Sequence, residues 1–253
     1  MTPSSGARFK DHFSERAAEY ARFRPRYPAR LFEALADLTP GHGLAWDCGT
    51  GNGQAAVGLA AHFRRVVATD ASPQQLAHAE RHSRVAYARS LETRSGLAAA
   101  TVDLVTVAQA LHWFDVEPFF AEVRRVLRPG AAIAAWCYDL ARVTPEIDAL
   151  TDRFAHQTVG PHWAPERRHV SAGYQDLPFP FEELPFPRCT MERELTLDQF
   201  AGYLDTWSAV RRFREAEGTD PLAPLIAAMA PLWGAAARTL RWPLKGRVGV
   251  VLS

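Results

Sequence analysis

The residues whose chemistry is clearest in this sequence form a glycine-rich segment that starts with a carboxylate. The segment reads DCGTGNG from Asp47 to Gly53, and it lies between an apolar stretch and a run with helical periodicity. Glycines at such a turn adopt backbone conformations that other residues avoid, and they let a ligand approach the bare backbone. A second carboxylate, Asp70, ends the next apolar stretch, where it can accept hydrogen bonds from both hydroxyls of a ribose. The two features together predict a binding site for a nucleoside.

Two kinds of cofactor use such a segment, and the position of Asp47 distinguishes them. Gly51, Gly53 and Ala56 satisfy the alanine variant of the G-x-G-x-x-G pattern, which binds nicotinamide dinucleotides. Asp47 and the glycines that follow it satisfy a D-x-G-x-G-x-G pattern instead. A carboxylate inside the loop repels a diphosphate and attracts an ammonium group, either directly or through water. The sequence therefore favours a positively charged thio-nucleoside, with an NAD(P)-dependent oxidoreductase as the alternative.

The elements that must position these residues are predicted by hydrophobic periodicity. The expected strands cover residues 43–47, 65–70, 84–88, 102–108 and 131–136, and the expected helices between them cover residues 53–62, 73–82 and 116–127. Ser72 and Pro73 are typical of the N-cap and the first turn of a helix. Because apolar strands alternate with helices, we expect an α/β fold with a doubly wound, mostly parallel sheet. Such a sheet binds its ligand at the carboxyl ends of the strands.

The N-terminal part of the chain is expected to form a helical lid. Phe9, Phe13 and Tyr20 share one face of a predicted helix, which the prolines at positions 25 and 28 end. A second helix is expected over residues 29–38. We therefore assign residues 1–40 to the lid.

The rest of the chain is assigned to the same single domain, residues 1–253. Residues 41–140 form the cofactor-binding core in this assignment, and residues 141–253 form a helical cap and C-terminal strands. Within the cap we expect irregular structure over 161–187, strands near 188–195 and 247–252, and helices over 197–217 and 222–240.

Two further motifs, beyond the glycine segment, resemble those of one family. The first combines Phe13 and Tyr20 with the sequence RPRYP over residues 24–28, and the second is AQALHWFD over residues 108–115. In this order and spacing the motifs resemble the class I S-adenosylmethionine-dependent methyltransferases, in particular the small-molecule branch with trans-aconitate methyltransferase-like proteins. The resemblance implies a Rossmann-like sheet of seven strands with a lid and an inserted cap. It also implies S-adenosyl-L-methionine as the cofactor and a small molecule with a carboxylate, a hydroxyl or a similar group as the methyl acceptor.

The resemblance also implies roles for individual residues. Asp70 is expected to hold the ribose, and Leu91 with Glu92 to meet the adenine edge, where the family commonly has an alanine before the glutamate. The full set expected to bind the cofactor is Tyr20, Arg24, Asp47, Gly49, Thr50, Gly51, Asp70, Ala71, Leu91, Glu92 and Gln109. The residues expected to face the acceptor are Phe13, Tyr27, His112 and Trp113.

His112 is the candidate general base, because it follows the fourth expected strand, close to the expected position of the methyl group. An imidazole with an unperturbed pKa of about 6.5 suits proton removal from a hydroxyl. A carboxylate acceptor needs no base, and in that case the histidine orients or packs other groups. Both interpretations of His112 remain open at this point.

Composition and charge limit which classes of partner and which cellular location we expect. The chain has 253 residues, with 29 Lys+Arg against 28 Asp+Glu, so its charge gives no general reason to bind nucleic acid. The segment after the fourth strand also lacks the acid or asparagine followed by prolines that nucleic-acid N-methylases carry there. With no apolar stretch of about 20 residues and no signal-peptide pattern, we expect a cytoplasmic protein that does not bind membranes. It is expected to be a monomer or a homodimer that binds a small-molecule substrate.

The cysteines and histidines predict no metal site. Cys48, Cys137 and Cys189 are far apart in the sequence and lack the paired spacing of metal ligands, so reduced, buried thiols are expected. A protein that binds S-adenosylmethionine without catalysis is a further alternative to the enzyme.

Overall fold

The computed structural model of the protein describes residues 25–251. The expected helix over residues 9–20, and with it Phe13, Tyr20 and Arg24, lies outside the described residues. The helix expected over residues 29–38 is present as α2.

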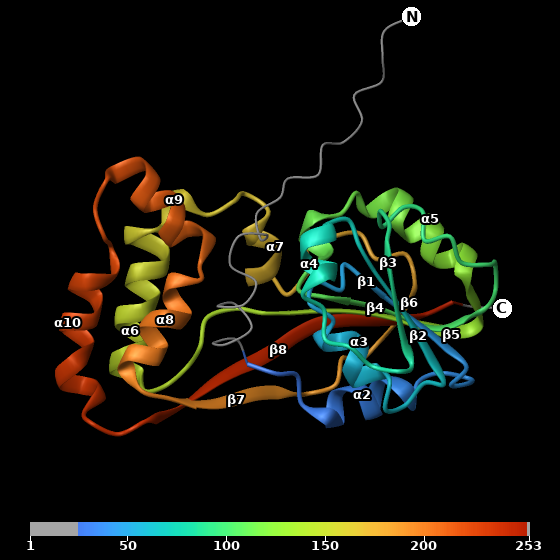
Figure 1. Ribbon diagram of the computed structural model, residues 1–253, viewed down its shortest axis with the longest axis horizontal. Coiled ribbons are helices and arrows are strands. Elements are labelled where there is room, and N and C mark those ends of the chain that lie inside the picture. Colours follow the sequence, from blue (N-terminus) through green and yellow to red (C-terminus); the bar gives the residue numbers. More distant parts are fainter. Residues whose placement is uncertain (1–24, 252–253) are drawn as a thin grey trace, which may run out of the picture.

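A central β-sheet forms the α/β half of the molecule, on the right in Figure 1. Seven strands lie side by side in the order β3-β2-β1-β4-β5-β8-β6. The pairs β3–β2, β2–β1, β1–β4 and β4–β5 are parallel, whereas β8 is antiparallel to both β5 and β6. The predicted doubly wound, mostly parallel sheet of seven strands is therefore confirmed. The strands are β1 Leu44–Cys48, β2 Arg65–Asp70, β3 Val85–Arg89, β4 Val102–Ala108, β5 Leu127–Tyr138, β6 Glu182–Leu184, β7 Thr190–Leu195 and β8 Arg238–Val250.

Helices cover both faces of the sheet. Ala45 and Trp46, neighbours on β1, belong to two different apolar clusters because successive strand residues point to opposite faces. The first cluster includes residues of α2 and α3, and the second includes residues of α5. The helices and helical turns are α2 Ala29–Ala36, α3 Gln54–Leu59, α4 Pro73–Ala77, η2 Leu111–Trp113, α5 Val116–Val126, α6 Pro145–Arg153, η3 Phe154–Thr158, η4 Gly160–His162, α7 Arg167–Ser171, α8 Leu197–Asp205, α9 Ser208–Glu217 and α10 Leu222–Trp233.

Local sequence signals explain where several helices begin. The Ser72 hydroxyl accepts a hydrogen bond from the Gln75 amide at 3.3 Å, as predicted for the N-cap of α4. The helix ends at Ala77, earlier than the expected residue 82. Thr144 caps α6 in the same way, through the Ile147 amide, and this helix is not among the sequence predictions.

The last strand is much longer than the sequence predicts. A helix was expected up to residue 240, but α10 ends at Trp233 and β8 begins at Arg238. Leu240, Trp242 and Leu244 are buried and alternate with exposed residues, which is the period of a strand and not of a helix. The first half of β8 pairs with β7, whereas its second half pairs with β5 and β6. The β7–β8 ribbon thereby connects the sheet to the helical cap (Figure 1).

The cap contains α6, α8, α9 and α10, on the left in Figure 1. The expected helix over residues 197–217 is divided into α8 and α9 at Thr206 and Trp207. Trp207 and Trp233 are buried in the cap core together with Phe200, so they stabilise the cap and do not line the ligand cavity. The segment expected to be irregular, 161–187, contains α7 and β6.

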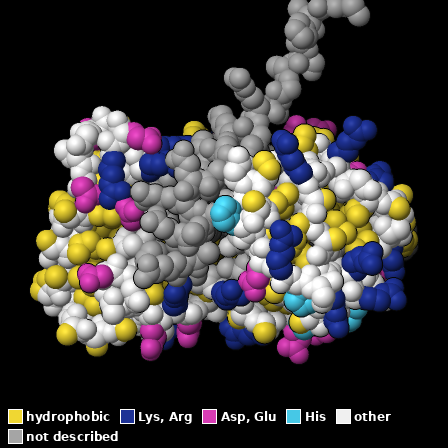
Figure 2. All heavy atoms as spheres, in the orientation of Figure 1, with side chains coloured by type: hydrophobic (Ala, Val, Ile, Leu, Met, Phe, Trp, Pro, Cys, Tyr) yellow, Lys and Arg dark blue, Asp and Glu magenta, His cyan; other side chains and the backbone are white. Residues whose placement is uncertain are grey.

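Two further sequence predictions concern burial and charge. Cys48, Cys137 and Cys189 are free thiols and all are buried, as expected. On the face shown in Figure 2, the Lys and Arg side chains are scattered among apolar and uncharged ones and form no continuous stripe.

Candidate active site

A cavity of about 640 Å³ opens at the carboxyl ends of the parallel strands. Its wall includes residues 49–52 after β1, 70–72 after β2, 90–93 after β3 and 108–110 after β4. Other wall residues include Tyr27, Trp113, Asp115, Tyr138 and Glu166. Ligand pockets commonly have volumes of about 300–1,000 Å³. The ends of the strands therefore meet at one cavity, as the sheet topology predicts.

The glycine segment adopts a conformation that requires glycine. Gly49 and Gly53 have φ values of 68° and 82°, which side chains rarely allow. A Cβ atom on Gly49 would lie 2.7 Å from the Ala110 Cβ, and one on Gly53 would lie 2.1 Å from the Tyr87 hydroxyl oxygen. The loop can therefore pack against the neighbouring strand ends and still expose its backbone to the cavity.

Asp70 is tied directly to the glycine segment. Its Oδ2 accepts a hydrogen bond from the Gly51 amide, and its Oδ1 accepts one from the Ser72 amide, both at 2.8 Å. These contacts fix the carboxylate at the cavity wall. The fold thus brings Asp70 and the glycine segment together, as their spacing in the sequence predicts.

Asp47 lies beneath the loop, not in the cavity wall. Its side chain is fully buried, and it accepts hydrogen bonds from the Thr50 hydroxyl at 2.5 Å and the Thr106 hydroxyl at 2.7 Å. Burial raises the pKa of Asp47 to about 6, and the two threonines oppose this shift. Asp47 is absent from the described lining residues, and its carboxylate anchors the loop to β4. The predicted attraction of the cofactor's ammonium group, directly or through water, stays a prediction. Thr106 was not singled out in the sequence.

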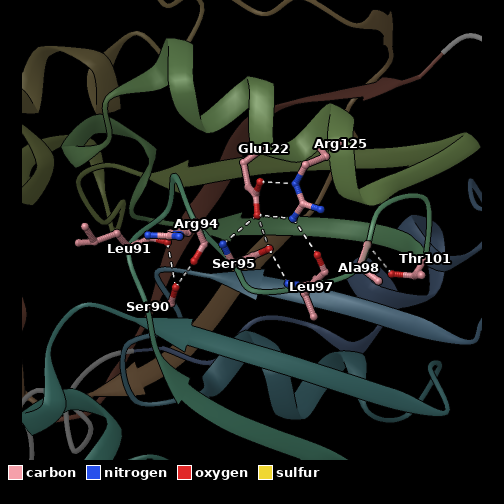
Figure 3. A network of polar contacts seen from close by, with 9 residues as sticks. All are labelled: Ser90, Leu91, Arg94, Ser95, Leu97, Ala98, Thr101, Glu122 and Arg125. Atoms are coloured by element: carbon pink, nitrogen blue, oxygen red, sulfur yellow. Dashed lines mark hydrogen bonds and ion pairs between the residues drawn. The ribbon is translucent and has the colours of Figure 1, made fainter.

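The segment after β3 carries Leu91 and Glu92 into the cavity wall. It is held against α5 by the network in Figure 3, whose centre is Glu122. Glu122 accepts a hydrogen bond from the Ser95 amide at 2.8 Å and pairs with the Arg125 guanidinium at 2.7 Å. The hydrogen bond from Arg125 lowers the pKa of Glu122 to about 2, so the pair stays charged at neutral pH. The network holds one side of the cavity in place.

Gln109 connects the ends of β4 and β5. Its φ is 57°, which is unusual for a residue other than glycine. The side-chain amide donates to the Tyr138 carbonyl and accepts from the Tyr138 amide, both at 2.9 Å. Both residues line the cavity. The side chain of Gln109 therefore continues the hydrogen bonding between β4 and β5 at the edge of the cavity. Tyr138 was not predicted as a site residue.

His112 lies behind the cavity wall. It is absent from the described lining residues, and its Nδ1 lies 3.2 Å from the hydroxyl of the buried Tyr174. Burial, with help from Arg167 and His169, lowers the pKa of His112 to about 3. The imidazole is therefore neutral at pH 7 but a weak base, which favours the orienting interpretation over the base. Its neighbour Trp113 is 36% exposed and does line the cavity, as does Tyr27.

The described part of the chain contains neither a cluster of metal-ligand side chains nor a helix that could span a membrane. Within residues 25–251, no three or more His, Cys, Asp or Glu residues form a group that could hold a metal ion. Over the same residues, no helix is both long enough and apolar enough to span a bilayer.

The comparison with known proteins gives the family. Residues 46–135 match the model of a methyltransferase domain family. A Dictyostelium discoideum protein provisionally described as a methyltransferase is 32% identical over 219 residues, which cover 85% of this chain and 83% of that protein. The chain belongs to the class I S-adenosylmethionine-dependent methyltransferases. This membership decides against the nicotinamide-dependent alternative.

Other relatives of this methyltransferase agree with the assignment. A solved structure from Anaeromyxobacter dehalogenans, provisionally described as a type II methyltransferase, is 48% identical with a TM-score of 0.86, and it covers 91% of this chain and 99% of its own. The malonyl-[acyl-carrier protein] O-methyltransferase of Dechloromonas aromatica is 36% identical, but the match covers only 53% of this chain and 51% of that protein. Phosphoethanolamine N-methyltransferase 2 of Haemonchus contortus, solved with S-adenosylmethionine, shares the fold at 16% identity and a TM-score of 0.50, and the match covers all of this chain and 62% of that one.

The residues present in this methyltransferase fit that cofactor. Among the described residues, the cavity wall contains four carboxylates, Asp70, Glu92, Asp115 and Glu166, and no lysine, arginine or histidine. Such a wall suits a positively charged ligand and repels a diphosphate. The exposed backbone of the glycine segment and the Asp70 carboxylate are the groups that a nucleoside requires.

Proposed function

We propose that this methyltransferase transfers the methyl group of S-adenosyl-L-methionine to a small-molecule acceptor bound in the same cavity. The observation that carries the proposal is the wall composition: carboxylates without basic side chains among the described residues, next to the aromatic rings of Tyr27, Trp113 and Tyr138. Aromatic walls are typical of pockets for small organic molecules. Cytoplasmic location, and a monomeric or homodimeric state, stay predictions.

We assign the cofactor to the part of the cavity next to β1, β2 and β3. In this proposal Asp70 binds the ribose hydroxyls and the backbone of Gly49, Thr50 and Gly51 follows the methionine portion. Ala71, Leu91 and Glu92 surround the adenine, and Gln109 meets the methionine end. Asp47 contributes through the loop that it anchors. Tyr20, Arg24 and Phe13 stay predictions for the same site.

In this reaction the main task of the protein is to align the acceptor with the methyl group of the cofactor. The cofactor, when bound, supplies an electrophilic methyl group on a sulfonium. The leaving thioether is neutral, so no residue has to donate a proton to it. The rings of Tyr27, Trp113 and Tyr138 orient the acceptor toward that methyl group and exclude water from it. In this proposal His112 orients other groups, and it does not remove the acceptor's proton.

The proposal is tested by calorimetric titration of the purified protein with S-adenosylhomocysteine. We expect saturable binding by the wild type and an affinity at least about tenfold lower for Asp70→Asn, because a hydrogen bond to a charged group is lost. Glu33→Gln, an exposed change on α2, serves as the control with unchanged affinity. Since His112 lies outside the wall, His112→Ala should also keep its affinity for the cofactor. Binding of NAD but not of S-adenosylhomocysteine would contradict the proposal.

A further inference from the structure

The acceptor must lie at one end of the cavity, and the strand order identifies that end. The order β3-β2-β1-β4-β5 places Asp70, at the end of β2, on one side of the glycine segment. Gln109 and Tyr138, at the ends of β4 and β5, lie on the other side. This step rests on the proposed function: if Asp70 holds the cofactor's ribose, the acceptor lies over β4 and β5.

Two carboxylates line the cavity wall beyond β4, namely Asp115 and Glu166, and Asp115 is exposed to solvent. Glu166 lines the wall and is half-buried. In the described part of the chain, its carboxylate makes no hydrogen bond and no ion pair. Asp70, by comparison, is held by two backbone amides. No lysine, arginine or histidine of residues 25–251 lines the same wall, so Glu166 presents an uncompensated acceptor of hydrogen bonds to whatever binds there.

The position of Glu166 is fixed from its C-terminal side by α7. Glu166 directly precedes this helix, whose first residue, Arg167, forms an ion pair with Asp139 just after β5. The Arg167 guanidinium also lies 4.6 Å from the ring centroid of Trp163. These contacts attach α7 to the end of the strand that carries Tyr138, and Arg167 is absent from the described residues of the cavity wall.

The other end of α7 is attached through His112. Tyr174 follows α7, is fully buried, and has its hydroxyl 3.2 Å from the His112 Nδ1. The two rings are also stacked, with centroids 6.1 Å apart. Because the imidazole is neutral at pH 7, this contact buries no charge. His112 thereby holds the segment that follows α7 against η2.

We infer that Glu166 receives the hydrogen-bond donor of the methyl acceptor, so that the acceptor is an amine or a hydroxyl compound and not a carboxylic acid. In the transfer step, a lone pair of the acceptor nitrogen or oxygen forms the new bond to the methyl carbon. The carbon–sulfur bond breaks and its electron pair stays on sulfur. The proton of the N–H or O–H group passes to a carboxylate oxygen of Glu166. A carboxylate acceptor has no proton to give, and it would be repelled by the charge of Glu166.

The experiment uses the full-length protein and a panel in which each carboxylic acid is matched by the primary amine and the hydroxyl compound on the same skeleton. Transfer of a labelled methyl group is measured for the wild type, Glu166→Gln, Glu166→Asp and the exposed control Glu33→Gln. Affinity for S-adenosylhomocysteine is measured for all four proteins by calorimetry, which also shows whether each variant is folded.

The expected result is methylation of amines or hydroxyl compounds by the wild type. Glu166→Gln should lower kcat/KM by about 100-fold, the range typical of losing a proton acceptor, and Glu166→Asp should restore part of it. The cofactor affinity should not change, and Glu33→Gln should match the wild type. Methylation of carboxylic acids alone, no methylation of any amine or hydroxyl member, or equal rates for wild type and Glu166→Gln would each overturn the inference. Failure of the wild type to bind S-adenosylhomocysteine would overturn the proposed function as well, so the two failures are distinguishable.

Discussion

At the scale of single residues, the site uses two aspartates in different environments. Asp70 lies at the cavity wall and binds two amides, whereas Asp47 is completely buried under the loop. Their spacing in the sequence predicted a common site, but the sequence did not distinguish a wall residue from an anchor. The distinction depends on Thr106, which comes from a strand far along the chain and completes the environment of Asp47.

The buried charge of Asp47 makes stability depend on pH. Burial raises its pKa in the folded protein to about 6, from 3.8 in an exposed carboxyl group. The unfolded protein therefore loses this proton first, and the contribution of Asp47 to stability falls as pH rises from about 4 to 6. Asp47→Asn does not titrate, so its unfolding free energy relative to wild type should rise by about 1 kcal/mol between pH 5 and pH 8. Urea unfolding at both pH values checks this, and an equal difference at both would contradict it.

Gly53 offers a second test at this scale, because two glycines with similar backbone angles have different surroundings. Gly53 and Gly130 have φ values of 82° and 73°, but only at Gly53 would a Cβ atom meet a neighbour, the Tyr87 hydroxyl. Gly130→Ala should lower the free energy of unfolding by about 1 kcal/mol because of backbone strain alone. Gly53→Ala should lower it by about 1–3 kcal/mol more because of the clash. Equal midpoints of urea unfolding for the two variants would show that Tyr87 moves aside freely.

At the scale of secondary-structure elements, periodicity predicted the strands that are apolar on both faces well. β2 and β4 have the expected bounds, since their burial leaves little choice of residue. The boundary between α10 and β8 was predicted wrongly. No residue after Gly234 carries a stronger turn signal, and pairing with β7 makes residues 238–240 the start of a strand.

The junction between β4 and β5 depends on the side chain of Gln109. Gln109→Ala removes two hydrogen bonds to Tyr138 and leaves a positive φ, so we expect a loss of about 2–3 kcal/mol in the free energy of unfolding. Gln109→Gly removes the same bonds but tolerates the backbone angle, so it should be about 1 kcal/mol more stable than Gln109→Ala. The opposite order in urea unfolding would mean that backbone strain is not stored at this position.

At the scale of the whole molecule, the sheet and the cap are connected through the long β8 strand (Figure 1). The cavity lies at the carboxyl ends of the parallel strands. Among the described residues after β5, Glu166 alone lines the cavity, and it directly precedes α7. The wall lining thus comes from distant parts of the chain, and a bound ligand should stabilise these parts together.

Hydrogen exchange measured by mass spectrometry tests this arrangement. Saturating S-adenosylhomocysteine should increase protection at residues 49–54, 70–75, 90–93 and 109–115, which line the cavity or adjoin it. Exchange in α10, at the far end of the cap, should not change. Protection confined to residues 43–44, 64–65 and 128, which line a smaller cavity at the opposite edge of the sheet, would place the ligand elsewhere.

The sequence by itself determined the features that depend on local constraints. The glycine segment needs positive φ angles, Asp70 must follow a strand, and the apolar runs must be buried, so these could be predicted from residue types and spacing. The tertiary structure decided which side chains share one wall. Glu166 carries no local signal, and His112 meets Tyr174 across 62 residues of sequence. Contacts of this kind are formed by packing between distant segments, and neither periodicity nor a motif contains that information.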